Sequence, residues 1–149
     1  MRAIVQRVLS ARVRVGERVV GEIGHGLLVF VGVGREDTAD DVQAVAAKIC
    51  EMRVFAGGGR PMERSVVDVG GSLLVVSQFT LYGDMRKGRR PSFDAAAPPD
   101  AARQRYEELV RELRATGVPI ATGEFQAMMQ VELVNDGPVT ILIDSKKQF

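Results

Sequence analysis

Hydrophobic and polar positions alternate in parts of this chain with the two-residue period of a β-strand. Residues 12–15, Arg-Val-Arg-Val, follow this period, and Gly16-Glu17-Arg18 predicts a turn into a further strand at Val19-Val20. Residues 27–31 and 73–76 are instead apolar at every position, which is typical of strands covered on both faces. These segments predict a sheet with a buried centre.

Two other segments repeat their apolar residues at helical spacing. The first predicted helix begins at Thr38, with Asp41 three residues later as a weak capping box. The second begins at Pro98-Pro99-Asp100, and Gly117 is a plausible stop for it. The apolar stripes are Val42, Val45, Ala46, Ile49 and Met52 in the first helix and Ala102, Tyr106, Leu109, Val110 and Leu113 in the second. Each predicted helix therefore has one face that can pack on a sheet.

The last third of the chain predicts mainly strands. Residues 118–121, 130–134 and 139–143 are the segments concerned, and the last two are joined by Asn135-Asp136-Gly137-Pro138. That composition is typical of a hairpin turn. Strands outnumber helices, so we expect one α+β domain over residues 1–149, with a mostly antiparallel sheet and two main helices packed on it.

Composition narrows the class of protein. The chain is 46% hydrophobic, enough for a core, and 20 Lys and Arg balance 19 Asp and Glu. Near-neutrality argues against a protein that coats nucleic acid, so any RNA contact must come from a local patch. Cys50 is the only cysteine, the first seven residues lack a signal-peptide core, and the apolar run from Gly26 to Gly34 is too short for a bilayer. We expect a cytoplasmic protein without membrane contact.

Residues for the common catalytic systems are scarce. The one histidine, His25, lies in a predicted turn, and Cys50 lies on the apolar face of the first helix, where packing is its expected role. One His, one Cys and no carboxylate cluster make no convincing zinc site, and nothing in the chain indicates a cofactor. An enzyme built from this sequence has to work without an imidazole base or a metal.

Two short segments carry most of the candidate chemistry. Residues 77–84 end a buried strand with hydrogen-bonding side chains around an aromatic ring, although such residues at strand ends often only satisfy backbone groups. Residues 135–140 place an X-Pro bond, where a cis peptide can occur, between two strands. Spacing alone favours the structural role for both segments.

Together, Ser77-Gln78-Phe79-Thr80-Leu81 and Asn135-Asp136-Gly137-Pro138-Val139-Thr140 resemble the paired signatures of the D-aminoacyl-tRNA deacylases. The resemblance covers the whole chain. Further stretches that carry it are Met1 to Val8, Gly21 to Gly24, Asp68 to Gly71 and Arg86 to Phe93. It implies a barrel-like core of the deacylase type and hydrolysis of the ester that joins a D-amino acid, or glycine, to the terminal adenosine of tRNA.

The resemblance also implies how D substrates are selected. Gly137-Pro138 is expected to have a cis peptide bond and to reach from one subunit of a homodimer into the active site of the other. Its carbonyls would line the pocket so that an L side chain clashes, which is selection by exclusion. Arg7, near the first strand's end, is a candidate to brace this loop.

Four neighbouring residues are the catalytic candidates. Thr80 is the natural nucleophile, but the sequence offers no obvious base to activate it. We therefore favour a water molecule that the ribose 2′-hydroxyl positions or activates. Backbone N–H groups around Phe79 and Thr80 would stabilise the oxyanion, and Gln78 and Ser77 would orient the ribose and the ester.

Two further groups of residues are expected to hold the tRNA. Residues 125–129 resemble the Phe-Gly-Ala-x-Met stretch of the family's adenine pocket, so Phe125 and Met129 are expected to sandwich the base, with core packing as the alternative. Gln126 stands where the family usually has glycine. The cations of the loop that follows Asp84 would grip acceptor-stem phosphates, or else pair with nearby acids. They are Arg86, Lys87, Arg89 and Arg90.

Two functions of other classes stay open at this point. One is a non-catalytic nucleic-acid-binding module that uses the basic loop, and the other is an esterase for a small molecule. Hydrolysis of D-aminoacyl-tRNA without added metal, with the L form spared, separates the deacylase from both.

Overall fold

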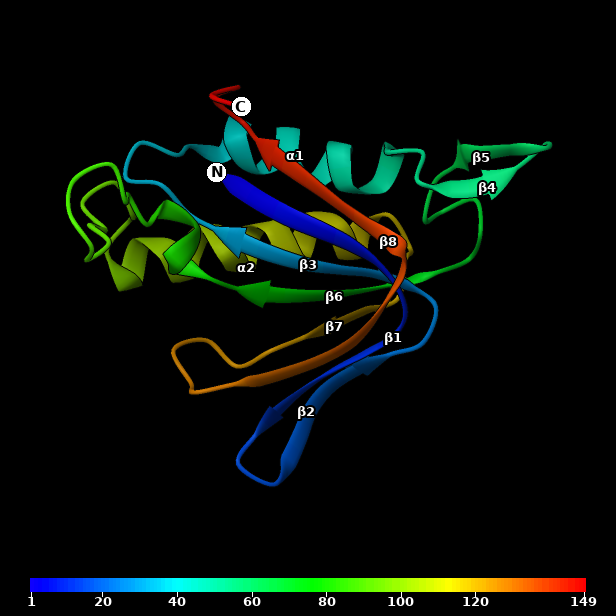
Figure 1. Ribbon diagram of the computed structural model, residues 1–149, viewed down its shortest axis with the longest axis horizontal. Helices are drawn as coiled ribbons and strands as arrows, with labels where there is room; N and C mark the ends of the chain where they lie inside the picture. Colours follow the sequence, from blue (N-terminus) through cyan, green and yellow to red (C-terminus); the bar gives the residue numbers. More distant parts are fainter.

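The computed structural model describes all residues from 1 to 149, and one sheet organises the chain (Figure 1). Its strands are β1 (Arg2–Val15), β2 (Arg18–Ile23), β3 (Gly26–Gly32), β6 (Ser72–Ser77), β7 (Ile120–Thr122) and β8 (Gln130–Asp144). The path through the sheet is β2-β1-β3-β6-β7, and β8 pairs with β1. The pairs β1–β2, β1–β3 and β1–β8 are antiparallel, whereas β3–β6 and β6–β7 are parallel. The predicted α+β class with a mostly antiparallel sheet is confirmed.

The sheet curls because the long strand β1 changes partners along its length. Its first half pairs with β3 and with the end of β8, and its second half pairs with β2 and with the beginning of β8. The curl brings β2 against β7, where a Cβ atom on Gly21 would collide with the carbonyl oxygen of Thr122. Glycine at position 21 therefore permits the close approach that nearly closes the barrel.

Alternate side chains of the buried strands enter two separate cores, as the two-residue strand period requires. On β6, Leu73 and Val75 face the helices and belong to the larger core. Leu74 and Val76 face the inside of the barrel and belong to a smaller core. The prediction that this strand is covered on both faces is confirmed.

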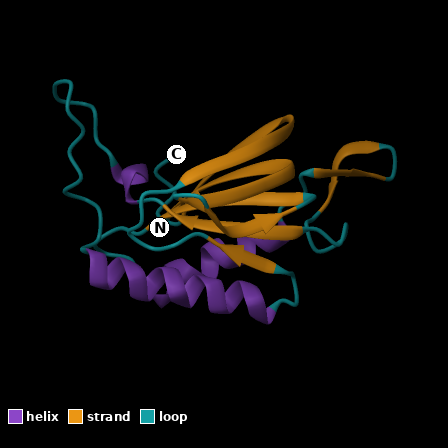
Figure 2. Cartoon of the chain, turned by 90° about the horizontal axis from the view of Figure 1, so that it is seen from below, coloured by secondary structure: helices purple, strands orange, loops and turns teal.

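Both predicted helices lie on one face of the sheet (Figure 2). They are α1 (Ala39–Glu51) and α2 (Pro99–Ala115). The backbone N–H of Thr38 donates to the Asp41 carboxylate over 2.8 Å, so Asp41 caps the first helix as expected. Gly117 has a φ of +85° just after the second helix, the conformation of a glycine stop signal. Neither helix has the length and hydrophobicity that crossing a bilayer requires.

The predicted hairpin at residues 135–138 is wrong. These residues lie inside β8, which runs unbroken from Gln130 to Asp144, and the register against β1 shifts on either side of Val8. The segment is therefore an irregularity within one strand, because asparagine, aspartate, glycine and proline suit a bulge as well as a turn. A hairpin does occur elsewhere, where Gly58 and Gly59 form the turn between β4 (Phe55–Gly57) and β5 (Arg60–Arg64).

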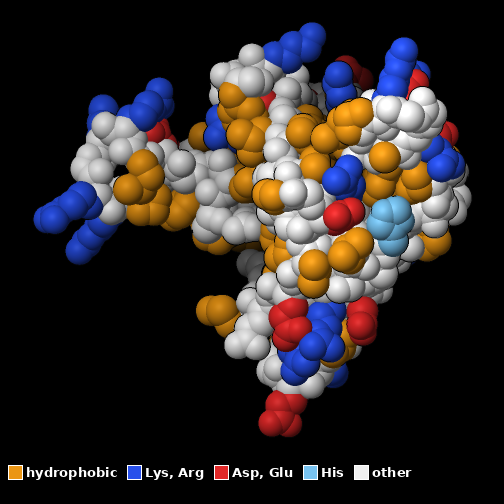
Figure 3. All heavy atoms as spheres, turned by 45° about the vertical axis from the view of Figure 1, so that its right-hand side comes forward, with side chains coloured by type: hydrophobic (Ala, Val, Ile, Leu, Met, Phe, Trp, Pro, Cys, Tyr) orange, Lys and Arg blue, Asp and Glu red, His pale blue; other side chains and the backbone are white.

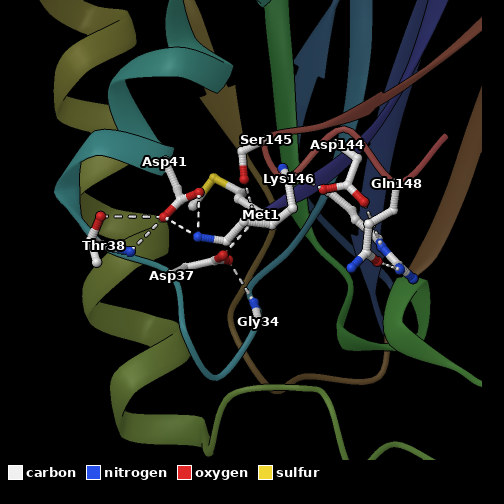
Figure 4. A network of polar contacts seen from close by, with 10 residues as sticks. Met1, Gly34, Asp37, Thr38, Asp41, Asp144, Ser145, Lys146 and Gln148 are labelled. Carbon is white, nitrogen blue, oxygen red and sulfur yellow. Dashed lines mark hydrogen bonds and ion pairs between the residues drawn. The ribbon is translucent and has the colours of Figure 1, made fainter.

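A buried polar network joins the two ends of the chain to the start of α1 (Figure 4). The Met1 ammonium is fully buried and donates to Asp37 and to the Ser145 hydroxyl, each over 2.6 Å. The second carboxylate oxygen of Asp37 accepts the backbone N–H of Gly34 over 2.6 Å. This network fixes the loop between β3 and α1.

Asp41 adds an ion pair to the same region, 3.1 Å from Lys146. Desolvation opposes ionisation of Asp41, but hydrogen bonds from Ser145, Thr38 and Lys146 outweigh it and hold the pKa of Asp41 well below its usual range. A carboxyl with a lowered folded-state pKa stabilises the fold fully above about pH 4 and loses this contribution as the pH falls further.

Candidate functional site

The segment from Ser77 to Thr80 leaves the sheet at the end of β6. Gln78 still donates its N–H to the Val31 carbonyl over 2.7 Å, and the 3-10 helix η1 (Phe79–Tyr82) begins directly after it. Because η1 turns away from the strand direction, Phe79 and Thr80 are exposed, and the Phe79 ring is 55% accessible. The chain thus presents this segment at a surface.

The first residues of η1 have free backbone donors. Neither the N–H of Phe79 nor that of Thr80 donates to another group of the protein, since the first N–H groups of a helix have no partner within it. The Thr80 hydroxyl accepts the side-chain amide of Gln78 over 3.0 Å and has no imidazole, amine or carboxylate partner. The Thr80 hydroxyl is therefore oriented by Gln78, but no basic group lies beside it to remove its proton.

A cavity of about 660 Å³ lies beside this segment. It is lined by Ser77 at the end of β6, Phe79 at the start of η1, Phe125 and Met129 from the turn before β8, and residues from the beginning of α2. Nine of its fourteen lining residues are hydrophobic, as is usual for a cavity that takes an aromatic ligand. Gln78 and Thr80 do not line it, so the structure brings together only part of the predicted catalytic and adenosine sets in one cavity.

Phe125 has both roles that the sequence left open. Its ring borders the cavity, yet it also packs on the larger core, with the Tyr106 ring centroid at 6.1 Å and the Arg103 guanidinium 4.6 Å from its own centroid. Met129 likewise borders the cavity and packs on the smaller core. Met128, between them in sequence, is 89% exposed and packs on neither core.

Gln126 adopts the backbone conformation that explains why glycine suits its position. Its φ is +64°, in the left-handed region where an L side chain costs about 1–2 kcal/mol. We expect Gln126→Gly to raise the free energy of unfolding by up to about 1 kcal/mol, because the relief of strain exceeds glycine's entropy cost. Urea unfolding measures this change. Ala127→Gly, in the same turn at a negative φ, is the control and should destabilise; a Gln126→Gly protein that is equally destabilised contradicts the strain argument.

The segment Gly137-Pro138 lies far along the sheet from Ser77. Its peptide bond is cis, and both residues are exposed. Neighbouring residues of β8 pair with β1 around Val8, which pairs in turn with the first residue of β3, whereas Ser77 pairs with Val31 near the end of β3. Within this chain the two signature segments therefore lie at opposite ends of the sheet.

Arg7 holds the Gly-Pro segment in place, as suspected from the sequence. Its Nε donates to the Asp136 carbonyl over 3.0 Å, and its terminal nitrogen donates to the Val54 carbonyl over 2.6 Å. Asn135 contributes from the other side, because its side-chain oxygen accepts the Val139 N–H over 2.9 Å. The bulge in β8 is thus fixed by side chains from two strands.

The four cations of residues 86–90 divide into two kinds. Arg86 forms a bidentate pair with Asp84, which also holds the pKa of that carboxyl well below its usual range. Lys87, Arg89 and Arg90 are exposed and have no acidic partner. Figure 3 shows positive side chains projecting at the left edge, where Figure 1 places this loop. Pairing with a nearby acid therefore describes Arg86 alone.

Other residues with unusual chemistry play no part in this cavity. His25 is exposed and contacts the Phe55 ring edge-on at 5.1 Å, and Cys50 is buried in the larger core, as expected for both. No three His, Cys, Asp or Glu side chains lie close enough together to hold a metal ion. Apart from the Arg35 guanidinium on the cavity wall, the chemistry available at the site is that of hydroxyl, amide and backbone groups beside an apolar cavity.

Known proteins resemble the chain along its length. Residues 4–144 match the family described as D-Tyr-tRNA(Tyr) deacylase. The chain is 60% identical to a D-aminoacyl-tRNA deacylase of Desulforudis audaxviator and 58% identical to one of Koribacter versatilis, each over the whole of both chains.

Two solved structures have the same fold. The c-Myc DNA Unwinding Element Binding Protein superposes with a TM-score of 0.92 at 40% identity, covering 97% of this chain and 98% of that one. A probable eukaryotic D-amino acid tRNA deacylase superposes with a TM-score of 0.79 at 16% identity, covering 95% of this chain and 97% of the other.

Proposed function

The chain belongs to the D-Tyr-tRNA(Tyr) deacylase family, and from that premise we propose that it hydrolyses the ester bond of D-aminoacyl-tRNA. The products are free tRNA and the D-amino acid, so the enzyme removes D-amino acids from tRNA before translation uses them. The observation that carries the proposal is a single cavity. Ser77 and Phe79 of the first signature segment line it, and so do Phe125 and Met129, which were predicted to hold the adenine.

The substrate fits this cavity through its terminal adenosine. An adenine base needs apolar and aromatic walls, and Phe125 and Met129 provide them. The ester then lies toward η1, where Gln78 and Ser77 orient the ribose and the reacting carbonyl. Glycine attached to tRNA is a further substrate, because it has no side chain to exclude.

The mechanism uses the substrate's own hydroxyl. Thr80 has no base within reach, so a water molecule positioned by the ribose 2′-hydroxyl attacks the carbonyl carbon. The tetrahedral oxyanion then accepts hydrogen bonds from the unpartnered N–H groups of Phe79 and Thr80. A proton of the attacking water passes to the 3′-oxygen as the intermediate collapses and the ester bond breaks. The products are the D-amino acid and a tRNA with a free 3′-hydroxyl.

Selection against L substrates requires a second copy of the chain. Gly137-Pro138 lies away from Ser77 within one protomer, so it reaches a site only if that site belongs to a partner. A homodimer is supported by β8, whose second edge is unpaired and whose Val134 and Leu142 are more than half exposed. In that dimer the carbonyls of Gly137-Pro138 form the wall that an L side chain strikes.

Gly137→Ala tests this wall. Gly137 has a φ of +138°, and a Cβ atom there would lie 2.8 Å from the Val139 side chain and 3.0 Å from its backbone nitrogen. Because the added carbon must move the segment, we expect the ratio of D to L hydrolysis to fall about tenfold or more. Hydrolysis of D- and L-tyrosyl-tRNA measures the ratio. Gly24→Ala, where a Cβ meets nothing within 4 Å, is the control. If a dimeric Gly137→Ala protein keeps the wild-type ratio of D to L hydrolysis, Gly137-Pro138 does not form the wall that excludes L substrates.

Lys87, Arg89 and Arg90 are the residues that grip the acceptor stem in this proposal, since no acid of the chain neutralises them. A nucleic-acid-binding module without catalysis is the main rival, and one structural neighbour bears a DNA-binding name. A deacylation assay with both enantiomers decides between the two. Release of D-tyrosine but not L-tyrosine from tRNA, without added metal, supports the deacylase; binding without release supports the rival.

A further inference from the structure

The cavity beside Ser77 has one charged side chain, Arg35, on its wall. The other thirteen lining residues are uncharged: nine are hydrophobic, two are prolines, and the last two are a serine and a glutamine. Arg35 lies in the loop between β3 and α1, is exposed, and also borders a neighbouring cavity of about 310 Å³. It therefore stands at the opening of the cavity rather than at its floor.

Arg35 is held firmly in this position. Its backbone N–H donates to the Ala95 carbonyl over 3.0 Å, and its side-chain Nε donates to the Asp94 carbonyl. The adjoining backbone is linked as well, because Ala97 donates to the Val33 carbonyl over 2.9 Å. The buried Asp37 accepts the Gly34 N–H and fixes the same loop from behind.

The charged end of Arg35 has no acidic partner. The arginine forms no ion pair, and the only acceptor of its side chain is a backbone carbonyl at Nε. Its terminal nitrogens keep their four N–H groups for a ligand, in the planar arrangement that matches phosphate oxygens. The guanidinium of Arg86, by contrast, is already paired with the Asp84 carboxylate.

We propose that Arg35 binds the 5′-phosphate of the terminal nucleotide whose adenosine occupies the cavity. The inference rests on the proposed function for the identity of the nucleotide. The nucleoside is uncharged and suits the apolar wall of the cavity. Its 5′-phosphate is anionic and suits Arg35, the single cationic side chain of that wall. The phosphate must also lie at the opening, because it connects the nucleoside to the rest of the RNA. Arg35 meets both requirements.

Binding of adenosine and of 5′-AMP to the whole protein tests the proposal without chemistry. For the wild type, we expect the phosphate to tighten binding about tenfold to a hundredfold, as one charge-assisted bidentate contact does. Arg35→Ala should remove this preference and leave adenosine binding unchanged, and Arg35→Lys should retain part of it. Arg111→Ala, which removes an exposed arginine of α2 outside the cavity, should keep the full preference.

Hydrolysis provides the second comparison, with the D-tyrosyl esters of adenosine and of 5′-AMP. Arg35→Ala should lower kcat/KM for the phosphorylated ester alone. An equal loss on both esters would make Arg35 a support of the cavity wall and overturn the proposal, as would a phosphate preference that survives Arg35→Ala. If the wild type prefers 5′-AMP through Arg35 yet releases no D-amino acid from tRNA, the proposed function fails and the nucleotide site stands.

Discussion

Removal of the 2′-hydroxyl from the terminal adenosine should lower the rate of D-aminoacyl-tRNA hydrolysis about a hundredfold or more, whereas Thr80→Ala should lower it less than tenfold. The difference follows from the surroundings of Thr80. Its hydroxyl accepts from Gln78 and has no group that removes its proton, so the threonine orients rather than attacks. The substrate's hydroxyl is the group that positions the water in the proposed mechanism, and the loss of one such contact in a transition state typically costs two to three orders of magnitude.

Single-turnover deacylation of a D-tyrosyl minihelix that ends in adenosine or 2′-deoxyadenosine measures the two effects on one scale. Gln78→Ala is an informative companion, because it removes the partner of the Thr80 hydroxyl without touching the backbone donors of η1. The ordering of the two losses is the decisive result. A covalent acyl group found on Thr80 by mass spectrometry, or a deoxy substrate that reacts normally, rules out the assisted-water mechanism.

Asp37→Ala should destabilise the fold by about 3–5 kcal/mol, the usual cost when one partner of a buried ion pair is removed. The Met1 ammonium and the Asp37 side chain are 0% and 2% exposed, and no other carboxylate is within hydrogen-bonding distance of that ammonium. The substitution also leaves the Gly34 N–H without its acceptor. For a chain of this size, the loss corresponds to a decrease of roughly 6–20 °C in Tm.

Thermal and urea unfolding measure the change at a single protein concentration, since the proposed homodimer would make Tm depend on concentration. Glu36→Ala removes an exposed carboxylate one residue away and should change the free energy of unfolding by less than about 0.5 kcal/mol. A comparably small change for Asp37→Ala would mean that water or the Ser145 hydroxyl satisfies the ammonium on its own.

Periodicity predicted the helices and the central strands because burial fixes one repeating face. Every apolar residue predicted for α2 is buried, from Ala102 to Leu113, and the capping role of Asp41 is present as well. Local composition was less informative at residues 135–138. Turn-forming residues there accompany a bulge, and only the length of β1 opposite them shows that β8 continues.

The candidate site could be assembled only from the three-dimensional structure. Phe79 and Phe125 are far apart in sequence and meet at one cavity only because β7 adds to β6 in parallel and α2 crosses beneath the sheet. Arg35 had no signal in the sequence, since an exposed arginine in a loop resembles any other. What distinguishes it is the combination of an apolar cavity beside it and the absence of an acid, and neither property is local in sequence.

The pairing of β1 with β8 sets the order in which this protein can mature. Most of the chain separates the two strands, and both cores depend on β1. During synthesis on the ribosome, β1 emerges first and has to wait for β8 before its second edge is covered, so the sheet closes late. Until then, the nascent chain exposes a long strand with alternating apolar residues, the kind of surface that chaperones recognise.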